Sequence, residues 1–101
     1  MKKILLVMAF SLAMLSACTQ EPTACFSTDK NSSVKENEEV QFNAGCSEDA
    51  LTYNWNFGDG STADGALVKH KYSTEGTYEV TLTALNGGQS NQATARVIVT
   101  K

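Results

Sequence analysis

The sequence predicts an all-β fold, an antiparallel sandwich of two sheets built from about seven short strands. Apolar and polar residues alternate with period two in several short runs, which is typical of strands with one buried face. Clusters of Gly, Asn, Asp and Ser separate these runs, as expected of turns. Beyond residue 23, no stretch shows the 3.6-residue apolar periodicity of an amphipathic helix. With 101 residues, of which 42% are hydrophobic and 19% charged, the chain is expected to form one small folded domain.

The alternation also predicts which side chains face inward. A first strand is expected at residues 24–27. The inward residues of the five later strands are, in order, Val40, Phe42 and Ala44; Tyr53, Trp55 and Phe57; Val68, His70 and Tyr72; Tyr78, Val80, Leu82 and Ala84; and Ala95, Val97 and Val99. The last two strands are expected to form a hairpin, because Asn86-Gly87-Gly88 between them accept positive φ.

The first 17 residues are typical of an export signal, with a basic start and an almost wholly apolar run at residues 4–14. That run is too short to cross a bilayer, which needs about 20 residues. Leu-Ser-Ala-Cys at residues 15–18 resembles the lipobox of bacterial lipoprotein signal peptides, in which the cysteine receives a diacylglycerol before cleavage. We therefore expect a signal peptide at residues 1–17, a lipidated tether at residues 18–23 and a folded domain at residues 24–101. A plain secretory signal that leaves Cys18 as a free thiol is the alternative.

Lipidation would hold the domain at a membrane of the bacterial cell envelope, outside the cytoplasm. The resemblance implies two or three acyl chains, and each buried methylene stabilises attachment by about 0.8 kcal/mol. Thr19 is not the aspartate that is linked to inner-membrane retention in some bacteria, which favours the outer membrane. The formal net charge of −3 argues against a nucleic-acid partner, because phosphate binding depends on clustered Lys and Arg.

Cys25 and Cys46 remain once Cys18 is lipidated, and we expect them to form a disulfide in the oxidising envelope. The bond would close a loop of about twenty residues, which stabilises a fold by about 3 kcal/mol in the chain-entropy treatment. A zinc site is disfavoured, because it needs three or four ligands and His70 is the one histidine of the sequence.

Residues 53–60, Tyr-Asn-Trp-Asn-Phe-Gly-Asp-Gly, closely resemble the Tyr-x-Trp-Asp-Phe-Gly-Asp-Gly motif of the PKD domain family. Residues 70–84 resemble the family's His-x-Tyr and Gly-x-Tyr-x-Val-x-Leu, and residues 40–47 resemble the segment before the first motif. The resemblance extends from residue 24 to residue 100 and implies an immunoglobulin-like β-sandwich. Asn56 stands where the family commonly has Asp, which weakens a family-based argument for a cation there.

The residue types of the first motif indicate structural roles. Trp55 is large enough to fill the space between two sheets. Gly58 and Gly60 allow a tight turn, and Asp59 between them can accept hydrogen bonds from backbone N–H groups. A weak calcium site at Asp59 and Asp64 stays open, although the segment lacks the ligand spacing of an EF-hand loop.

The second motif is also expected to be structural. Tyr78, which follows Gly76, resembles the tyrosine that pins the corner of immunoglobulin-like sandwiches through its hydroxyl group. His70 lies on the apolar face beside Tyr72, where a packed, hydrogen-bonded imidazole is expected and not a general base. No nucleophile elbow, phosphate-binding loop or metal-binding histidine pair is present, so we expect neither catalysis nor a cofactor.

The remaining functional classes concern binding. Sugar recognition uses exposed aromatic rings, but six rings fall on faces expected to be buried, and Phe26 is expected to turn inward as well. The outer faces are rich in Thr, Asn, Gln and Ser, and an exposed edge strand could pair with another strand. We therefore expect a lipid-anchored module of the cell envelope that binds a protein partner. The alternative is a polysaccharide-binding accessory module of a secreted system that degrades carbohydrate or protein.

Overall fold

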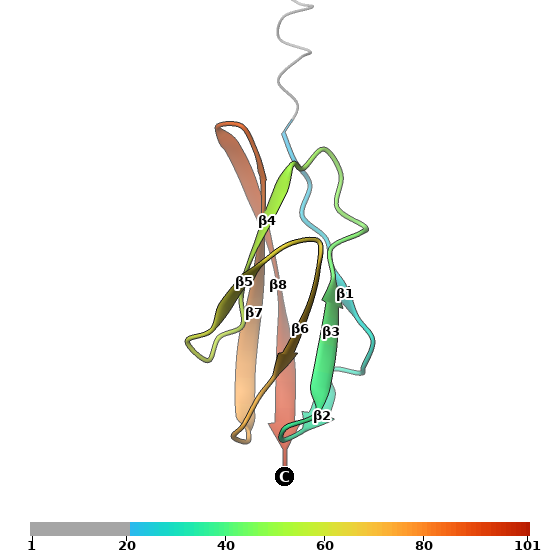
Figure 1. Cartoon of the computed structure of the whole chain (residues 1–101), viewed down its shortest axis with the longest axis vertical. Helices are drawn as coiled ribbons and strands as arrows, with labels where there is room; N and C mark the ends of the chain where they lie inside the picture. Colours follow the sequence, from blue (N-terminus) through green and yellow to red (C-terminus); the bar gives the residue numbers. More distant parts are fainter. Residues whose placement is uncertain (1–20) are drawn as a thin grey trace, which may run out of the picture.

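The computed structural model describes residues 21–101, which form two facing β-sheets (Figure 1). The strands are β1 (Ser27–Thr28), β2 (Ser33–Lys35), β3 (Glu39–Asn43), β4 (Thr52–Asn56), β5 (Thr62–Asp64), β6 (Leu67–Lys71), β7 (Gly76–Asn86) and β8 (Gln89–Thr100). One sheet has the order β1-β3-β6 and the other the order β2-β8-β7-β4-β5. Residues 21–101 contain no helix that is long and apolar enough to cross a membrane. The predicted all-β sandwich is confirmed.

Strand β2 was not predicted, and its pairing with β8 is the one parallel pairing among the strands of residues 21–101. Val34 of β2 lies opposite Val99 of β8, whereas the other neighbouring strands run antiparallel. A strand of three residues is too short to show alternation, which is why the sequence pattern missed both β2 and the equally short β5.

The first strand lies later in the chain than predicted, at Ser27–Thr28 in place of residues 24–27. The side chain of Ser47 explains the difference, because its Oγ accepts a hydrogen bond from the N–H of Cys25 and donates one to the Cys25 carbonyl. These side-chain bonds satisfy the backbone of Cys25 without a neighbouring strand.

Residues 21–23 were expected to belong to the tether, but they lie on the domain. Pro22 is fully buried. The N–H and C=O groups of Thr23 both bond to the backbone of Glu48, at 2.8 and 3.1 Å, and the side-chain amide of Asn91 donates to the Pro22 carbonyl. The folded part therefore begins before residue 24. Cys18 and the proposed signal peptide lie outside the described residues.

The core fills the space between the sheets. Its buried apolar residues are Val34, Val40, Phe42, Ala44, Trp55, Phe57, Tyr72, Val80, Leu82, Ala84, Val97 and Val99. Most of the inward positions predicted by alternation are among them. Tyr53, Val68, His70 and Tyr78 are half-buried, whereas Ala95 is exposed. The inward pattern thus fails at the margins, where the facing sheet does not reach.

The hairpin between β7 and β8 forms at the predicted place. Asn86 and Gln89 are the last paired residues, and Gly87 and Gly88 make the turn between them. Gly87 has a φ of 63°, in the left-handed region that glycine adopts at little cost.

Candidate functional site

The Gly-Asp-Gly turn joins β4 to β5 and lies against the backbone of β7. Gly58 and Gly60 have φ angles of 83° and 92°. A Cβ atom on Gly58 would lie 2.5 Å from the carbonyl oxygen of Glu79, whereas one on Gly60 would meet no atom within 4 Å. Gly58 is therefore needed both for its φ and for the close approach of two backbones. The Asn56 side chain also accepts a hydrogen bond from the Gly58 N–H.

Asp59, at the tip of this turn, uses both carboxylate oxygens. Oδ1 accepts a hydrogen bond from the Ser61 N–H at 3.0 Å, and Oδ2 lies 2.7 Å from His70 Nε2. The side chains of His70 and Asp59 are only 15% and 21% exposed. Burial alone would raise the pKa of Asp59, but hydrogen bonds from His70 and Ser61 and the charge of His70 together hold this pKa below its ordinary value.

His70 is packed as well as hydrogen-bonded. Its ring stacks on Phe57 with centroids 4.1 Å apart and planes 4° from parallel, and it meets the Tyr72 ring edge-on at 4.7 Å. The Tyr72 hydroxyl donates to the Phe57 carbonyl at 3.0 Å, and burial raises the pKa of Tyr72. Because β6 and β4 belong to different sheets, the pairs Asp59–His70 and Phe57–Tyr72 tie the two sheets together.

Tyr78 closes the corner before β7. Its hydroxyl donates to the carbonyl of Thr74, four residues earlier, at 2.7 Å. The Tyr78 ring stacks on Tyr72 at 4.4 Å, and Gly76 at the start of β7 lies beside that ring. These contacts fix the backbone where the chain enters its second-longest strand.

Cys25 and Cys46 form the predicted disulfide, with a Cα–Cα distance of 5.3 Å and 21 residues of sequence separation. The bond joins the segment before β1 to the connection between β3 and β4. Phe26, beside it, turns inward as predicted and meets the Trp55 ring edge-on at 5.1 Å.

The two carboxylates considered for calcium have separate partners. Asp59 bonds to His70 and Ser61, whereas Asp64 accepts a hydrogen bond from the Asn54 side-chain amide at 2.7 Å. Residues 21–101 hold no group of three or more His, Cys, Asp or Glu side chains that could bind a metal ion.

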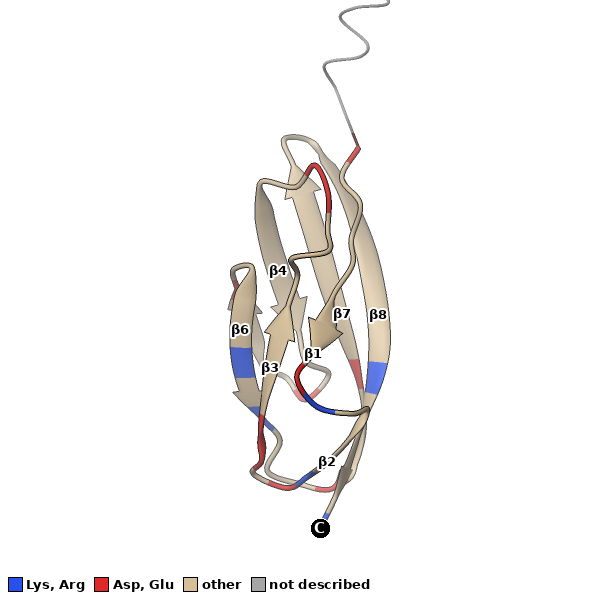
Figure 2. Cartoon of the chain, turned by 90° about the vertical axis from the view of Figure 1, so that its right-hand side faces the viewer, with Lys and Arg blue, Asp and Glu red and all other residues tan. Residues whose placement is uncertain are grey.

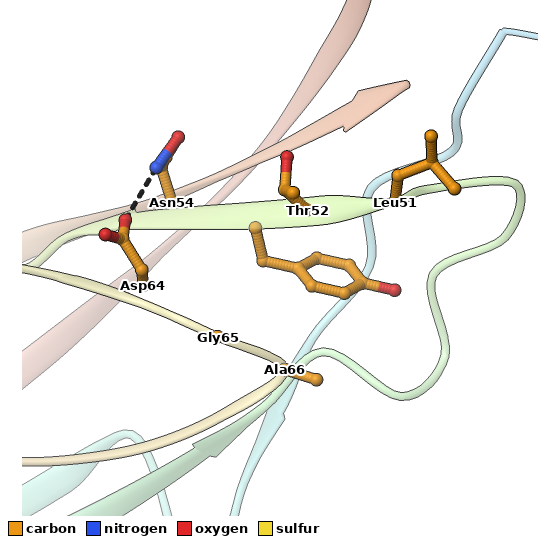
Figure 3. A pocket seen from close by; sticks show the side chains of 7 residues that line it. Leu51, Thr52, Asn54, Asp64, Gly65 and Ala66 are labelled. Carbon is orange, nitrogen blue, oxygen red and sulfur yellow. Dashed lines mark hydrogen bonds between the residues drawn. The ribbon is translucent and has the colours of Figure 1, made fainter. Parts of the chain in front are cut away.

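A shallow depression of about 520 Å³ lies beside β4 (Figure 3). Its lining residues are Leu51, Thr52, Tyr53, Asn54, Asp64, Gly65 and Ala66. The depression exists because the chain moves away from β4 after β5. The Gly65 N–H still donates to the Tyr53 carbonyl, but the carbonyl of the next residue, Ala66, accepts a hydrogen bond from the N–H of Ala44, directly after β3 of the other sheet. Tyr53, predicted to be buried, is consequently only half covered, and Leu51 is 73% exposed.

Trp55 stabilises the segment at Gly65, where the chain passes from one sheet to the other. Its side chain is 1% exposed, and its indole N–H donates to the Gly65 carbonyl at 2.7 Å. No sequence pattern predicts this hydrogen bond or the Asp59–His70 pair, because each joins two segments whose relative placement is set by the packing of the sheets.

Comparison with known proteins places these features in a family. Residues 19–100 match the PKD domain family. Collagenase ColA of Clostridium perfringens is 39% identical over an alignment of 80 residues, with a coverage of 73% of this chain and 7% of the collagenase. Collagenase ColA of Bacillus cereus is 37% identical over 68 residues, 62% of this chain and 7% of the collagenase. The chain thus corresponds to about 7% of the length of these relatives.

Solved structures agree. A structure from a study of promiscuous carbohydrate-binding modules of the β-sandwich superfamily superimposes with a TM-score of 0.74 and 36% identity, covering 81% of this chain and 35% of the other. The PKD1 domain of the Vibrio cholerae metalloprotease PrtV gives a TM-score of 0.67 and 28% identity, covering 81% of this chain and all of that domain. The match over residues 19–100, together with the shared sandwich, shows that this chain belongs to the PKD domain family.

Proposed function

We propose that this PKD domain is a non-catalytic binding module, held at the cell envelope by a lipid on Cys18, that presents its sandwich to a protein partner. The carrying observation is the distribution of side chains. Apart from Tyr53, the aromatic rings of residues 21–101 and the histidine are used inside the fold, where they pack on each other and bond across the sheets. The surface left for a partner consists of a mostly polar sheet face, a few exposed apolar side chains such as Leu51 and Leu67, and the strand edges.

A non-catalytic role is supported by the contacts of His70, the one histidine of the sequence. The imidazole of His70 is stacked on Phe57, and its Nε2 is paired with Asp59, so the ring takes part in contacts that hold the fold together. The relatives point the same way, because the part of each collagenase that resembles this chain is about 7% of the enzyme.

The outer face of the five-stranded sheet is suited to protein contacts. Across β4, β7 and β8, Asn54, Thr83 and Gln92 lie in one row and Asn56, Thr81 and Thr94 in the next. Gln92 Nε2 donates to Thr83 Oγ1 within the first row. These neutral hydrogen-bonding groups stand on a rigid sheet and would favour a polar partner surface.

Polysaccharide binding is the second candidate, and the depression beside β4 favours it. Tyr53, which is half-covered, lines the depression together with the hydrogen-bonded side chains of Asn54 and Asp64, which Figure 3 shows. The lining therefore combines an aromatic residue with amide and carboxylate groups. The likeness to a structure from a study of carbohydrate-binding modules supports this reading. One half-covered tyrosine offers less stacking area than an open aromatic platform, which keeps this function second.

Two measurements test the proposal. Metabolic labelling with a tagged fatty acid should mark the native chain and leave a Cys18→Ala variant unmarked. Equal labelling of the two chains would show that Cys18 does not carry the lipid. Crosslinking in the native envelope should yield the same protein neighbour reproducibly, while the purified domain binds no glycan on an array. Glycan binding that is lost in Tyr53→Ala, without any reproducible protein neighbour, would reverse the order of the two functions.

A further inference from the structure

The strand β8 is paired unequally along its two sides. Strand β7 covers one side along the whole length, from Gln89 to Val99, whereas β2 covers the other only at Ile98–Thr100. The hairpin register makes the odd-numbered residues of β8 bond to β7, so the even-numbered residues direct their N–H and C=O groups to the other side. The bonds from Ile98 N–H to Ser32 and from Glu36 N–H to the Thr100 carbonyl fit this parity.

Above β2, the outward N–H and C=O groups belong to Gln92, Thr94 and Arg96. Within residues 21–101, no strand pairs with them on that side. Figure 2 shows this part of β8 at the free margin of the molecule. The side chain of Asn91, which holds the segment at Pro22, lies on the inward face and leaves the edge itself open.

The pairing of β2 with β8 shows how a strand can bind at this edge of β8. Val34 of β2 lies opposite Val99, reaches between the sheets and is only 4% exposed. Four residues before Val99 in the sequence, Ala95 also faces inward but is exposed, and no strand pairs with β8 beside it on this edge. A strand added beside residues 92–96 would therefore bond through its backbone and cover Ala95 with an alternate apolar side chain.

We propose that the β8 edge from Gln92 to Arg96 is a docking site for an extended segment of a protein partner, with apolar residues at alternate positions. The inference rests on the proposed protein-binding function and assigns it a place. A row of alternating donors and acceptors is matched by another extended backbone, whereas a sugar has no such repeat. The small side chain of Ala95 and the neutral side chains of Gln92 and Thr94 leave room for it.

A second copy of this chain fits the edge less well. A two-fold pair of β8 strands would be antiparallel, so the two long axes would point in opposite directions. The chain enters the domain at Glu21, at the opposite end of the long axis from the C-terminus (Figure 1). Two such entry points would face away from each other, and lipids on both chains could not reach one membrane side by side.

The test uses the mature chain and a defined probe, a nine-residue peptide in which Thr and Val alternate between terminal lysines. Hydrogen exchange measured by NMR at saturating peptide should slow on the order of tenfold at the amides of Gln92, Thr94 and Arg96. Thr94→Pro removes an edge N–H that no strand uses and should abolish this protection. Thr94→Val keeps the N–H and should preserve it.

A second variant covers the case in which Thr94→Pro does not fold. Ala95→Lys leaves the backbone intact but places a charge at the inward margin, and it should also abolish protection. Absent protection, protection at other residues, or equal protection in a folded Thr94→Pro variant would overturn the inference. Envelope crosslinks to a protein partner that map away from residues 92–96 would overturn it too, while leaving the proposed function intact. Glycan binding without a protein neighbour would instead contradict the proposed protein-binding function.

Discussion

The carboxylate of Asp59 and the imidazole of His70, eleven residues apart in the sequence, meet at 2.7 Å and join the two sheets of the sandwich. Asp59 belongs to the turn after β4, and His70 belongs to β6 in the opposite sheet. The same two elements are linked a second time by the hydrogen bond from Tyr72 to the Phe57 carbonyl. The motif residues are thus explained by how they hold two layers together.

The Asp59–His70 pair should make stability depend on acidity. The pKa of Asp59 is lowered in the folded state from its ordinary value of 3.8, so the unfolded chain binds the proton more tightly. The pair therefore stabilises the fold fully above pH 3.8, and this contribution is lost as the pH falls through the folded pKa. Asp59→Asn should be less stable at neutral pH and should lose less stability on acidification, as measured by urea unfolding at several pH values.

Asp64→Asn is the matched control, because Asp64 lies on the same hairpin but bonds to Asn54. Its acid profile should follow that of the native chain. If Asp59→Asn and the native chain lost stability equally between pH 5 and pH 2, the pair would have no energetic role.

The two glycines of the turn should differ sharply in their tolerance of alanine. Both need a positive φ, which costs alanine about 1 to 2 kcal/mol. At Gly58 the added Cβ would also lie 2.5 Å from the backbone oxygen of Glu79, and the turn would have to move away from β7. We expect Gly58→Ala to lose about 3 to 5 kcal/mol and Gly60→Ala about 1 to 2 kcal/mol in denaturant unfolding. Equal losses would show that the close approach is unimportant.

Truncation of Trp55 should be among the most damaging changes to the core. Its side chain is 1% exposed, contacts the Phe26, Phe42 and Phe57 rings, and donates to the Gly65 carbonyl. Trp55→Ala should therefore cost about 3 to 5 kcal/mol. Leu51→Ala is the control, since Leu51 is 73% exposed and should change stability by less than about 0.5 kcal/mol. A native-like unfolding midpoint for Trp55→Ala would contradict the assignment of the core.

The disulfide should account for a sizeable share of the stability of so small a domain. With a sequence separation of 21 between Cys25 and Cys46, the chain-entropy treatment gives about 3 kcal/mol. The Cys25→Ala, Cys46→Ala double variant should lose about that amount in denaturant unfolding. Reducing agent should destabilise the native chain and leave the double variant unchanged; a native chain indifferent to reductant would show that the bond is not formed.

The sandwich was predictable because its long strands alternate in sequence as they do in space. Phe42, Trp55 and Leu82 sit at inward positions of predicted strands, and all are buried. Tyr53 packs against the core as its inward position predicts, but it is only half-buried, because alternation reports which face a side chain takes and not where the facing sheet ends. The crossing of the chain at Gly65 uncovers that ring, and no local pattern announces it.

The residues of the candidate site could be predicted from the sequence, but most of the contacts between them could not. The glycines of the turn follow from residue type, because glycine accepts the backbone conformation that the turn needs, whereas the role of the corner tyrosine was predicted from the family resemblance. The pairing of Asp59 with His70 and the hydrogen bond from Trp55 to Gly65 join segments about ten residues apart, so they depend on how the two sheets pack. The parallel strand β2 has three residues and pairs with the far end of the chain, and it was therefore missed.

Ionisation of the buried Tyr72 hydroxyl at high pH should destabilise the folded domain. Burial raises the pKa of its hydroxyl above the ordinary value of 10.0, so the folded state keeps the proton that the unfolded chain releases. The stabilisation is complete below pH 10.0 and is lost as the pH rises toward the folded pKa. Tyr72→Phe should remove this loss between pH 10 and pH 12, as measured by urea unfolding against pH.

Tyr78→Phe separates ionisation from the loss of a hydroxyl. Tyr78 also donates to a backbone carbonyl, that of Thr74, but it is more exposed than Tyr72. At neutral pH, Tyr72→Phe should cost about 1 to 3 kcal/mol, because it leaves the buried Phe57 carbonyl without its donor, and Tyr78→Phe about 0.5 to 1.5 kcal/mol. Tyr78→Phe should keep the alkaline loss. If it removed that loss and Tyr72→Phe did not, the titrating group would be the corner tyrosine, and the buried link between β6 and β4 would not control alkaline unfolding.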